Sequence, residues 1–111
     1  MTRRIDFHEF ARDEYIAAAR WYEDRQEGLG REFMNAVESV IERAADDRLP
    51  GLAGGTPNAG VLKLLELRFG FVIYFELGGD VMYVWAVAHG HRRPGYWYPR
   101  LAGPGSACEP R

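Results

Sequence analysis

The sequence predicts one α+β domain in which an N-terminal αα-hairpin packs on a small antiparallel β-sheet. Apolar residues recur every three or four positions over the first 47 residues, as in helices, whereas residues 61–89 are dense in β-branched and aromatic residues, as in strands. A chain of 111 residues, 47% of them hydrophobic, suits a single domain and is too short for two. We expect the domain to span residues 1–101 and residues 102–111 to form a flexible tail.

The first half predicts a short strand followed by two helices. Residues 5–8 alternate between apolar and polar side chains, as in an edge strand. An amphipathic helix is expected from residue 9 to about residue 26, with acidic residues in its first turns, and a second helix then runs to about residue 47. Only a short segment with Gly28 and Gly30 separates them, so the two helices should fold back on each other.

The second half predicts a loop and then three consecutive strands. Pro and Gly are concentrated in residues 49–60, which we expect to be loop. The strands are expected at 61–68, 71–77 and 81–89, and the tight links between them make an antiparallel meander. The core is predicted where this sheet meets the second helix, with Phe33, Val37, Val40 and Ile41 facing Phe71, Ile73 and Phe75.

Composition and spacing argue against a membrane protein, a secreted protein and a metalloenzyme. No apolar run approaches the roughly 20 residues of a membrane span, and the N-terminus lacks the apolar segment of a signal peptide, so we expect a cytoplasmic protein without membrane contact. Cys108 is the single cysteine and has no disulfide partner. His89 and His91 lack a third metal ligand nearby, and no phosphate-binding loop or credible nucleophilic serine is present. No cofactor is therefore expected.

Charge is distributed unevenly along the chain. Residues 1–47 contain seven arginines and twelve acidic residues, whereas residues 48–111 contain seven basic and four acidic residues. The positive half includes a basic-aromatic cluster that consists of Arg92, Arg93, Tyr96, Trp97, Tyr98 and Arg100. Such a cluster can pair with phosphates and stack on bases or on partner side chains. It can equally be structural, with aromatic rings that seal the edge of the sheet while the arginines stay solvated. The sequence leaves both interpretations open.

Four segments carry a family resemblance. They are ARWYE at 19–23, GLGREF at 28–33, LRFGFVIY at 67–74 and VAHGHRRPGYW at 87–97. In this order they resemble the ParE/RelE superfamily of bacterial type II toxin–antitoxin toxins, in particular its ParE-like plasmid stabilisation proteins. The resemblance covers nearly the whole chain, from residue 5 to residue 101. It implies the helical hairpin and small sheet predicted above, and a toxin that a cognate antitoxin neutralises within a hetero-oligomer.

The resemblance also separates two mechanisms. RelE-like members cleave mRNA in the ribosome with basic residues on the sheet and with an Arg and a Tyr near the C-terminus, whereas ParE-like members poison DNA gyrase. Aligned with the nucleases, Arg92 and Tyr98 match, but Phe71 stands in place of the sheet Arg. RNA cleavage needs cations beside the charge that develops on the phosphate. The resemblance therefore favours a ParE-like toxin that is not a nuclease, with DNA gyrase as its target.

Two alternatives remain open. Arg68, near a strand end, could restore one charge, which leaves a ribosome-dependent mRNA endonuclease with Arg68, Arg92 and Tyr98 as its catalytic residues. The other alternative is an inactive, toxin-like interaction module. The neighbouring reading frame bears on this choice, because a small antitoxin gene there would support both toxin interpretations and weaken the module.

Two surfaces are expected to carry the binding function. The target-binding residues should come from the basic-aromatic cluster and include Arg92, Arg93, Tyr96 and Trp97. The helical hairpin holds more large apolar residues than a single buried stripe needs, which predicts an apolar antitoxin-binding groove with Trp21, Met34, Val37 and Ile41. An antitoxin segment that is disordered when free would fold into this groove and pair its acids with the positive half of the chain.

Overall fold

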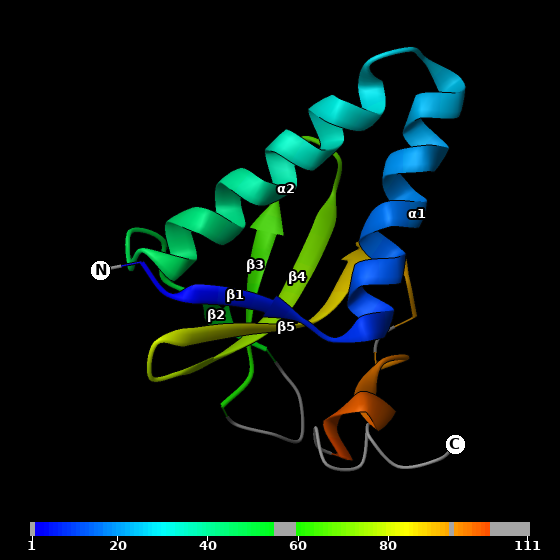
Figure 1. Cartoon of the computed structure of the whole chain (residues 1–111). Coiled ribbons are helices and arrows are strands. Elements are labelled where there is room, and N and C mark those ends of the chain that lie inside the picture. The colour runs from blue at the N-terminus through cyan, green and yellow to red at the C-terminus, as the bar shows by residue number, and fades with distance from the viewer. Residues whose placement is uncertain (1, 55–59, 94, 103–111) are drawn as a thin grey trace.

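The computed structural model confirms the α+β fold class and the predicted order of the main elements (Figure 1). It describes residues 2–54, 60–93 and 95–102. The elements are β1 (Arg4–Phe7), α1 (Glu9–Arg25), α2 (Leu29–Ala45), β2 (Leu52–Ala53), β3 (Leu62–Glu66), β4 (Phe71–Gly78), β5 (Val81–His89) and a short 3-10 helix, η1 (Tyr98–Ala102). Apart from Ala102, the tail expected at 102–111 lies outside the described residues, as does Cys108.

The five strands form one sheet in the order β1-β5-β4-β3-β2. β3, β4 and β5 pair antiparallel, as the meander predicts, and β2 pairs antiparallel with β3, whereas β1 pairs in parallel with β5. The sheet is therefore mixed. It differs from the antiparallel sheet expected because the helical hairpin and three strands separate β1 from β5, so no tight turn dictates the direction of β1. β2 lies within the predicted loop, and its two residues are too few to produce a periodic pattern.

The turn between α1 and α2 depends on two glycines and one carboxylate. Gly28 has a φ of 86°, a left-handed conformation that glycine adopts without strain. The carboxylate of Glu23 accepts hydrogen bonds from the amides of Gly28 and Gly30, each at 3.0 Å, and these bonds hold the pKa of Glu23 below its usual value. Gly30 also lets the helices approach closely, since a Cβ there would lie 2.6 Å from the carbonyl oxygen of Ala19.

The main core lies between the helical hairpin and one face of the sheet, as predicted. α1 packs on β5 and α2 on β3 (Figure 1). Phe33 is fully buried and its ring lies edge-on to that of Phe71, with 4.8 Å between the centroids. The other expected core residues belong to the same cluster, namely Val37, Val40, Ile41, Ile73 and Phe75. The predicted inward face of β4 is therefore confirmed.

A β-bulge in β5 accompanies a second buried cluster. Tyr74 of β4 pairs with Ala86, but the next residue, Phe75, pairs with Val84, so Trp85 is the extra residue. Trp85 and Ala86 pack with Trp97 in a cluster separate from the helix-side core. Trp97 belongs to residues 95–102, which we call the C-terminal segment. This segment thus packs against the sheet through its aromatic side chains.

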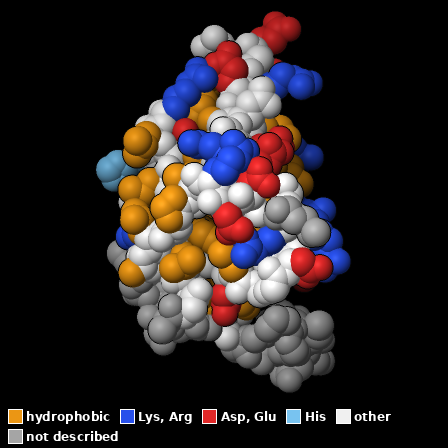
Figure 2. Space-filling model, turned by 90° about the vertical axis from the view of Figure 1, so that its left-hand side faces the viewer, with side chains coloured by type: hydrophobic (Ala, Val, Ile, Leu, Met, Phe, Trp, Pro, Cys, Tyr) orange, Lys and Arg blue, Asp and Glu red, His pale blue; other side chains and the backbone are white. Residues whose placement is uncertain are grey.

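Other parts of the surface keep apolar side chains in contact with solvent. Leu52 in β2, Leu65 in β3 and Leu67 just after β3 are exposed. Figure 2 shows hydrophobic side chains gathered on the left of one molecular face, with Arg, Asp and Glu side chains interleaved toward the right. Within the described ranges, no helix has both the length and the apolar character needed to cross a lipid bilayer.

Candidate functional site

A groove of about 490 Å³ lies between α1 and the C-terminal half of β5, and we call it the α1–β5 groove. It exists because β1 pairs with β5 only as far as Val84, which leaves the remaining edge of this strand beside α1. Apolar and aromatic side chains form most of its wall. The lining residues are Glu14, Ala17, Ala18, Trp21, Tyr22, Phe71, Val87, His89 and Arg92.

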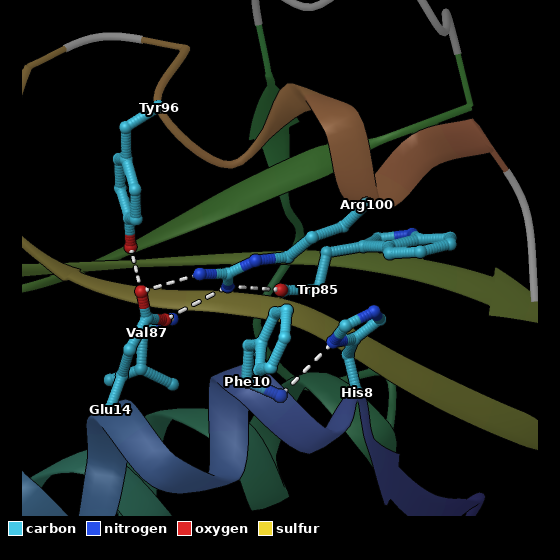
Figure 3. A network of polar contacts seen from close by, with 7 residues as sticks. All are labelled: His8, Phe10, Glu14, Trp85, Val87, Tyr96 and Arg100. Carbon is cyan, nitrogen blue, oxygen red and sulfur yellow. Dashed lines mark hydrogen bonds and ion pairs between the residues drawn. The ribbon is translucent and has the colours of Figure 1, made fainter. Parts of the chain in front are cut away.

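The carboxylate of Glu14 is the centre of a polar network beside the groove (Figure 3). Its Oε1 accepts hydrogen bonds from the amide of Val87 at 3.0 Å and from Nη1 of Arg100 at 3.1 Å. Its Oε2 accepts from the Tyr96 hydroxyl at 2.5 Å and from Nη2 of Arg100 at 2.8 Å. Nη1 of Arg100 also donates to the carbonyl of Trp85 at 3.0 Å. Side chains of α1 and of the C-terminal segment therefore cover the strand edge that β1 leaves open.

This network neutralises the one acid that lines the groove. The side chains of Glu14 and Arg100 are only 15% and 11% exposed, and their hydrogen bonds are charge-assisted and bidentate. Burial, and then the hydrogen bond to Glu14, raise the pKa of Tyr96 well above its usual value. Tyr96 therefore keeps its proton at physiological pH, and its hydroxyl continues to donate a hydrogen bond to Glu14.

Basic and imidazole side chains also line the groove. The guanidinium carbon of Arg92 lies 4.1 Å from the centroid of the Tyr96 ring, a cation–π contact. The rings of His89 and His91 stack with 5.0 Å between centroids, and the amide of His91 donates to Nδ1 of His89 at 3.2 Å. In the part of the chain that the structure describes, no group of three or more His, Cys, Asp or Glu side chains is placed to hold a metal ion. The groove thus combines an apolar wall with the exposed guanidinium of Arg92.

The predicted target-binding residues occupy different environments. Arg92 and Arg93 are exposed, and Tyr96 is half-buried. Trp97 is 1% exposed and packs against Tyr74, with 4.7 Å between the ring centroids. Trp97 is therefore a core residue of the second cluster, where its ring seals the sheet instead of facing solvent, and its part in target binding stays a prediction.

The predicted antitoxin-binding residues are also divided. Trp21 is 52% exposed on the wall of the α1–β5 groove, with the guanidinium carbon of Arg25 3.5 Å from its ring centroid. Met34 is half-buried and lines a second groove, of about 580 Å³, between α1 and α2. Val37 and Ile41 are 0% and 2% exposed, so a partner cannot reach them in the folded chain. Both side chains pack in the main core under the sheet, and their part in antitoxin binding stays a prediction.

The residues of the alternative nuclease site are engaged in structural contacts. Arg68 forms an ion pair with Glu32 of α2. Tyr98 is half-buried in η1, and its ring lies edge-on to that of Trp97 with 5.3 Å between centroids. Phe71, which stands at the position of the family's sheet Arg, is 7% exposed and belongs to the main core. Of the three alternative catalytic residues, only Arg92 lines the α1–β5 groove.

The roles of Glu14 and Arg100 are not predicted from the sequence, which places Glu14 among the early acids of a helix and Arg100 in the basic-aromatic cluster. One signal for Glu14 is present. It follows the buried Ala11 by three residues and precedes the half-buried Ala18 by four, so it lies on the same helical face as the apolar stripe. An acid in that position needs a partner, but the spacing does not show which cation supplies it.

Comparison with known proteins gives a likeness of fold. No family model matches the sequence, and no curated protein matches it either. A solved structure described as the chromosomal ParDE TA system from P. aeruginosa superposes with a TM-score of 0.56 at 16% sequence identity, over 79% of this chain and 96% of that chain. In its fold, this chain is therefore similar to that ParDE structure.

Proposed function

We propose that this chain is the toxin of a bacterial type II toxin–antitoxin system, of the ParE-like kind, and that it inhibits growth by binding a cellular target until a cognate antitoxin neutralises it. One observation carries the proposal: on a fold similar to a ParDE structure, the α1–β5 groove offers an apolar wall together with the guanidinium of Arg92. An open apolar groove on a small domain is typical of a binding surface. DNA gyrase is the target that the sequence resemblance favours, and the cytoplasm is the compartment.

The proposal is for binding, not for RNA cleavage. A nuclease stabilises the charge that develops on the phosphate with several cations that can approach it. Here Arg68 is already paired with Glu32, and Phe71 is buried at the position where the nucleases carry Arg. Tyr98 packs against Trp97. These contacts support a toxin that acts without catalysis.

The experiment that tests this function combines a growth assay with two biochemical assays. Inducible expression of the full chain in a bacterial host should arrest growth, and co-expression of a small neighbouring reading frame should restore it. The purified protein should inhibit supercoiling of relaxed plasmid by DNA gyrase. Primer extension on translated mRNA should show no codon-positioned cuts.

Each alternative function gives a different result in the same experiment. Codon-positioned cuts together with unimpaired gyrase would establish the RelE-like mRNA endonuclease. Folded protein that causes no growth arrest, but still captures the product of the neighbouring frame, would establish the inactive interaction module.

A further inference from the structure

We propose that the α1–β5 groove receives an acidic peptide segment with apolar anchor residues, and that Arg92 binds its carboxylates. The identity of the segment rests on the proposed function, under which it belongs to the antitoxin. The choice of an acidic, apolar segment rests on the wall of the groove, on its charge, and on the way in which Tyr96 holds Arg92.

The wall of the groove suits apolar side chains. Ala17 and Ala18 are small, so α1 offers room beside the larger rings of Trp21 and Tyr22. Trp21 is 52% exposed, although its indole is among the largest apolar groups of the chain. Covering this surface would remove apolar area from water, which favours binding. A groove of about 490 Å³ has space for an anchor side chain of Leu or Phe size.

The charge of the groove favours carboxylates. Among the described residues, Glu14 is the one acid in its lining, and Arg100 already compensates it. Arg92 is exposed and forms no ion pair within the described ranges. Arg25 places a second guanidinium over Trp21 at 3.5 Å from the ring centroid. The groove therefore has an excess of positive charge, and charge complementarity points to an acidic occupant.

Arg92 is oriented by two contacts in series. The Tyr96 ring lies against its guanidinium at 4.1 Å, and the Tyr96 hydroxyl is anchored on Glu14 at 2.5 Å. A guanidinium held against a ring can still donate its N–H groups to a carboxylate, which Arg binds bidentately. A side chain that is already held loses less conformational entropy on binding. Tyr96 and Glu14 are therefore positioning residues for Arg92.

A nucleic acid matches the groove less well than a peptide does. Binding of a polyanion uses a row of cations along the path of the phosphates. Among the described residues that line the α1–β5 groove, Arg92 is the one Lys or Arg, and Arg25 adds a guanidinium over Trp21. A protein segment in which Leu or Phe alternates with Glu complements both the wall and the charge.

The test measures binding of synthetic peptides to the full chain by isothermal titration calorimetry. One short peptide alternates Leu and Phe with Glu, and its matched control carries Gln in place of every Glu. We expect the Glu peptide to bind about 10-fold more tightly, because charge-assisted hydrogen bonds are stronger than neutral ones. In NMR titrations, the amide shifts caused by both peptides should cluster at Trp21, Val87 and Arg92.

Four variants separate the contributions to binding. Arg92→Ala should weaken binding of the Glu peptide about 10-fold and leave the affinity for the Gln peptide unchanged. Trp21→Ala should weaken binding of both peptides equally, because it removes apolar surface that both peptides contact. Tyr96→Phe keeps the ring but removes its anchor on Glu14, so it should reduce the preference for Glu over Gln. The matched control, Arg20→Ala, removes the same charge from a residue that lines the other groove and should change either affinity by less than about twofold.

Three results would overturn the inference. Equal affinity for the Glu and Gln peptides would show that the groove does not bind the carboxylates of the peptide. Equal losses of affinity for the Glu peptide in Arg92→Ala and Arg20→Ala would show that only the net charge of the protein matters, and not a contact with Arg92. An unstructured RNA or DNA oligonucleotide that displaces the Glu peptide at lower concentration would show that the groove recognises phosphate.

The proposed function and the groove can fail separately. If expression causes no growth arrest while the peptides follow the expected order, the function is wrong and the groove assignment stands. If the antitoxin restores growth and binds Arg92→Ala as tightly as the wild type, the function stands and the groove assignment is wrong.

Discussion

The carboxylate of Glu14 connects three parts of the chain. It accepts hydrogen bonds from the amide of Val87, the hydroxyl of Tyr96 and the guanidinium of Arg100, so that α1, β5 and the C-terminal segment meet at one side chain. Removing one partner of a buried ion pair is costly, because the other charge stays buried without compensation. An exposed pair carries no such penalty, since water solvates the group that remains.

Glu14→Gln should therefore destabilise the protein strongly. The substitution keeps the size of the side chain but leaves the charge of Arg100 uncompensated, which should lower the free energy of unfolding by about 3–5 kcal/mol. Guanidinium chloride unfolding measures this loss. The control is Glu32→Gln, which breaks the exposed pair with Arg68 and should cost less than about 1 kcal/mol. Equal losses would mean that water reaches the Glu14 pair in solution.

Tyr15 and Tyr96 make the free energy of unfolding depend on pH in the alkaline range. Burial, together with hydrogen bonds to Glu38 and Glu14, raises the pKa values of Tyr15 and Tyr96 above the usual 10.0. Both stay protonated in the folded protein while the unfolded chain ionises. Their contribution is complete below pH 10 and is lost as the pH rises above it, by up to about 1.4 kcal/mol per pH unit for each tyrosine. Unfolding free energies should fall less steeply with pH in Tyr96→Phe than in the wild type, and an unchanged slope would count against the Glu14 contact.

At the scale of elements, β5 shows how far a strand can be predicted from its sequence. Its ends at residues 81 and 89 are predicted correctly, because turn residues flank a run of strong β-formers. The bulge at Trp85 is not predictable, since residues 81–88 are all apolar or aromatic and no polar side chain marks either face. The parallel pairing of β1 is not predictable either, because a short strand of alternating residues can pair with a neighbour in parallel or antiparallel direction. The burial of Val37 and Ile41, in contrast, is predicted correctly, because both belong to the apolar stripe of α2.

Ile73 tests which face of β4 lies in the core. Its side chain is 0% exposed, so Ile73→Ala should lower the free energy of unfolding by about 2–5 kcal/mol through lost burial and the cavity that remains. Val72→Ala is the matched control on the opposite face, where the side chain is half-buried, and it should cost clearly less. Thermal melts of both variants decide the matter. A Tm for Ile73→Ala close to that of the wild type would show that the faces of the sheet are reversed.

At the scale of the whole molecule, the α1–β5 groove assembles residues that the sequence singles out for separate reasons. Trp21 is predicted as an antitoxin contact, Phe71 as a departure from the nuclease pattern, and Arg92 as a target contact, yet all three line one groove. Their convergence depends on where the end of β5 lies relative to α1, which is a tertiary property. What the sequence does predict is an apolar excess in the hairpin and a positive charge in the second half, and the groove lies where these two features meet.

The proposed mechanism gives an order of variants in a growth assay. Tyr98→Phe should leave growth inhibition nearly intact, because loss of one hydroxyl removes at most a hydrogen bond from a binding surface. Combined Arg92→Ala and Arg93→Ala should weaken inhibition more, since two charge-assisted contacts are lost. A nuclease would give the reverse order, with mRNA cleavage slowed by orders of magnitude in Tyr98→Phe while binding persists. Cleavage mapping beside the growth curves separates the two.

The pairing of Glu14 with Arg100 also bears on how the protein is made. Glu14 leaves the ribosome early, but the guanidinium that compensates it is added 86 residues later. β1 likewise cannot pair until β5, its neighbour in the sheet, has been synthesised. Contacts between such distant residues form late in folding. A nascent chain that ends before Arg100 therefore lacks the finished groove, and the groove is completed only after Arg100 has been synthesised. Under the proposed function, an antitoxin therefore finds its complete groove only after this late step.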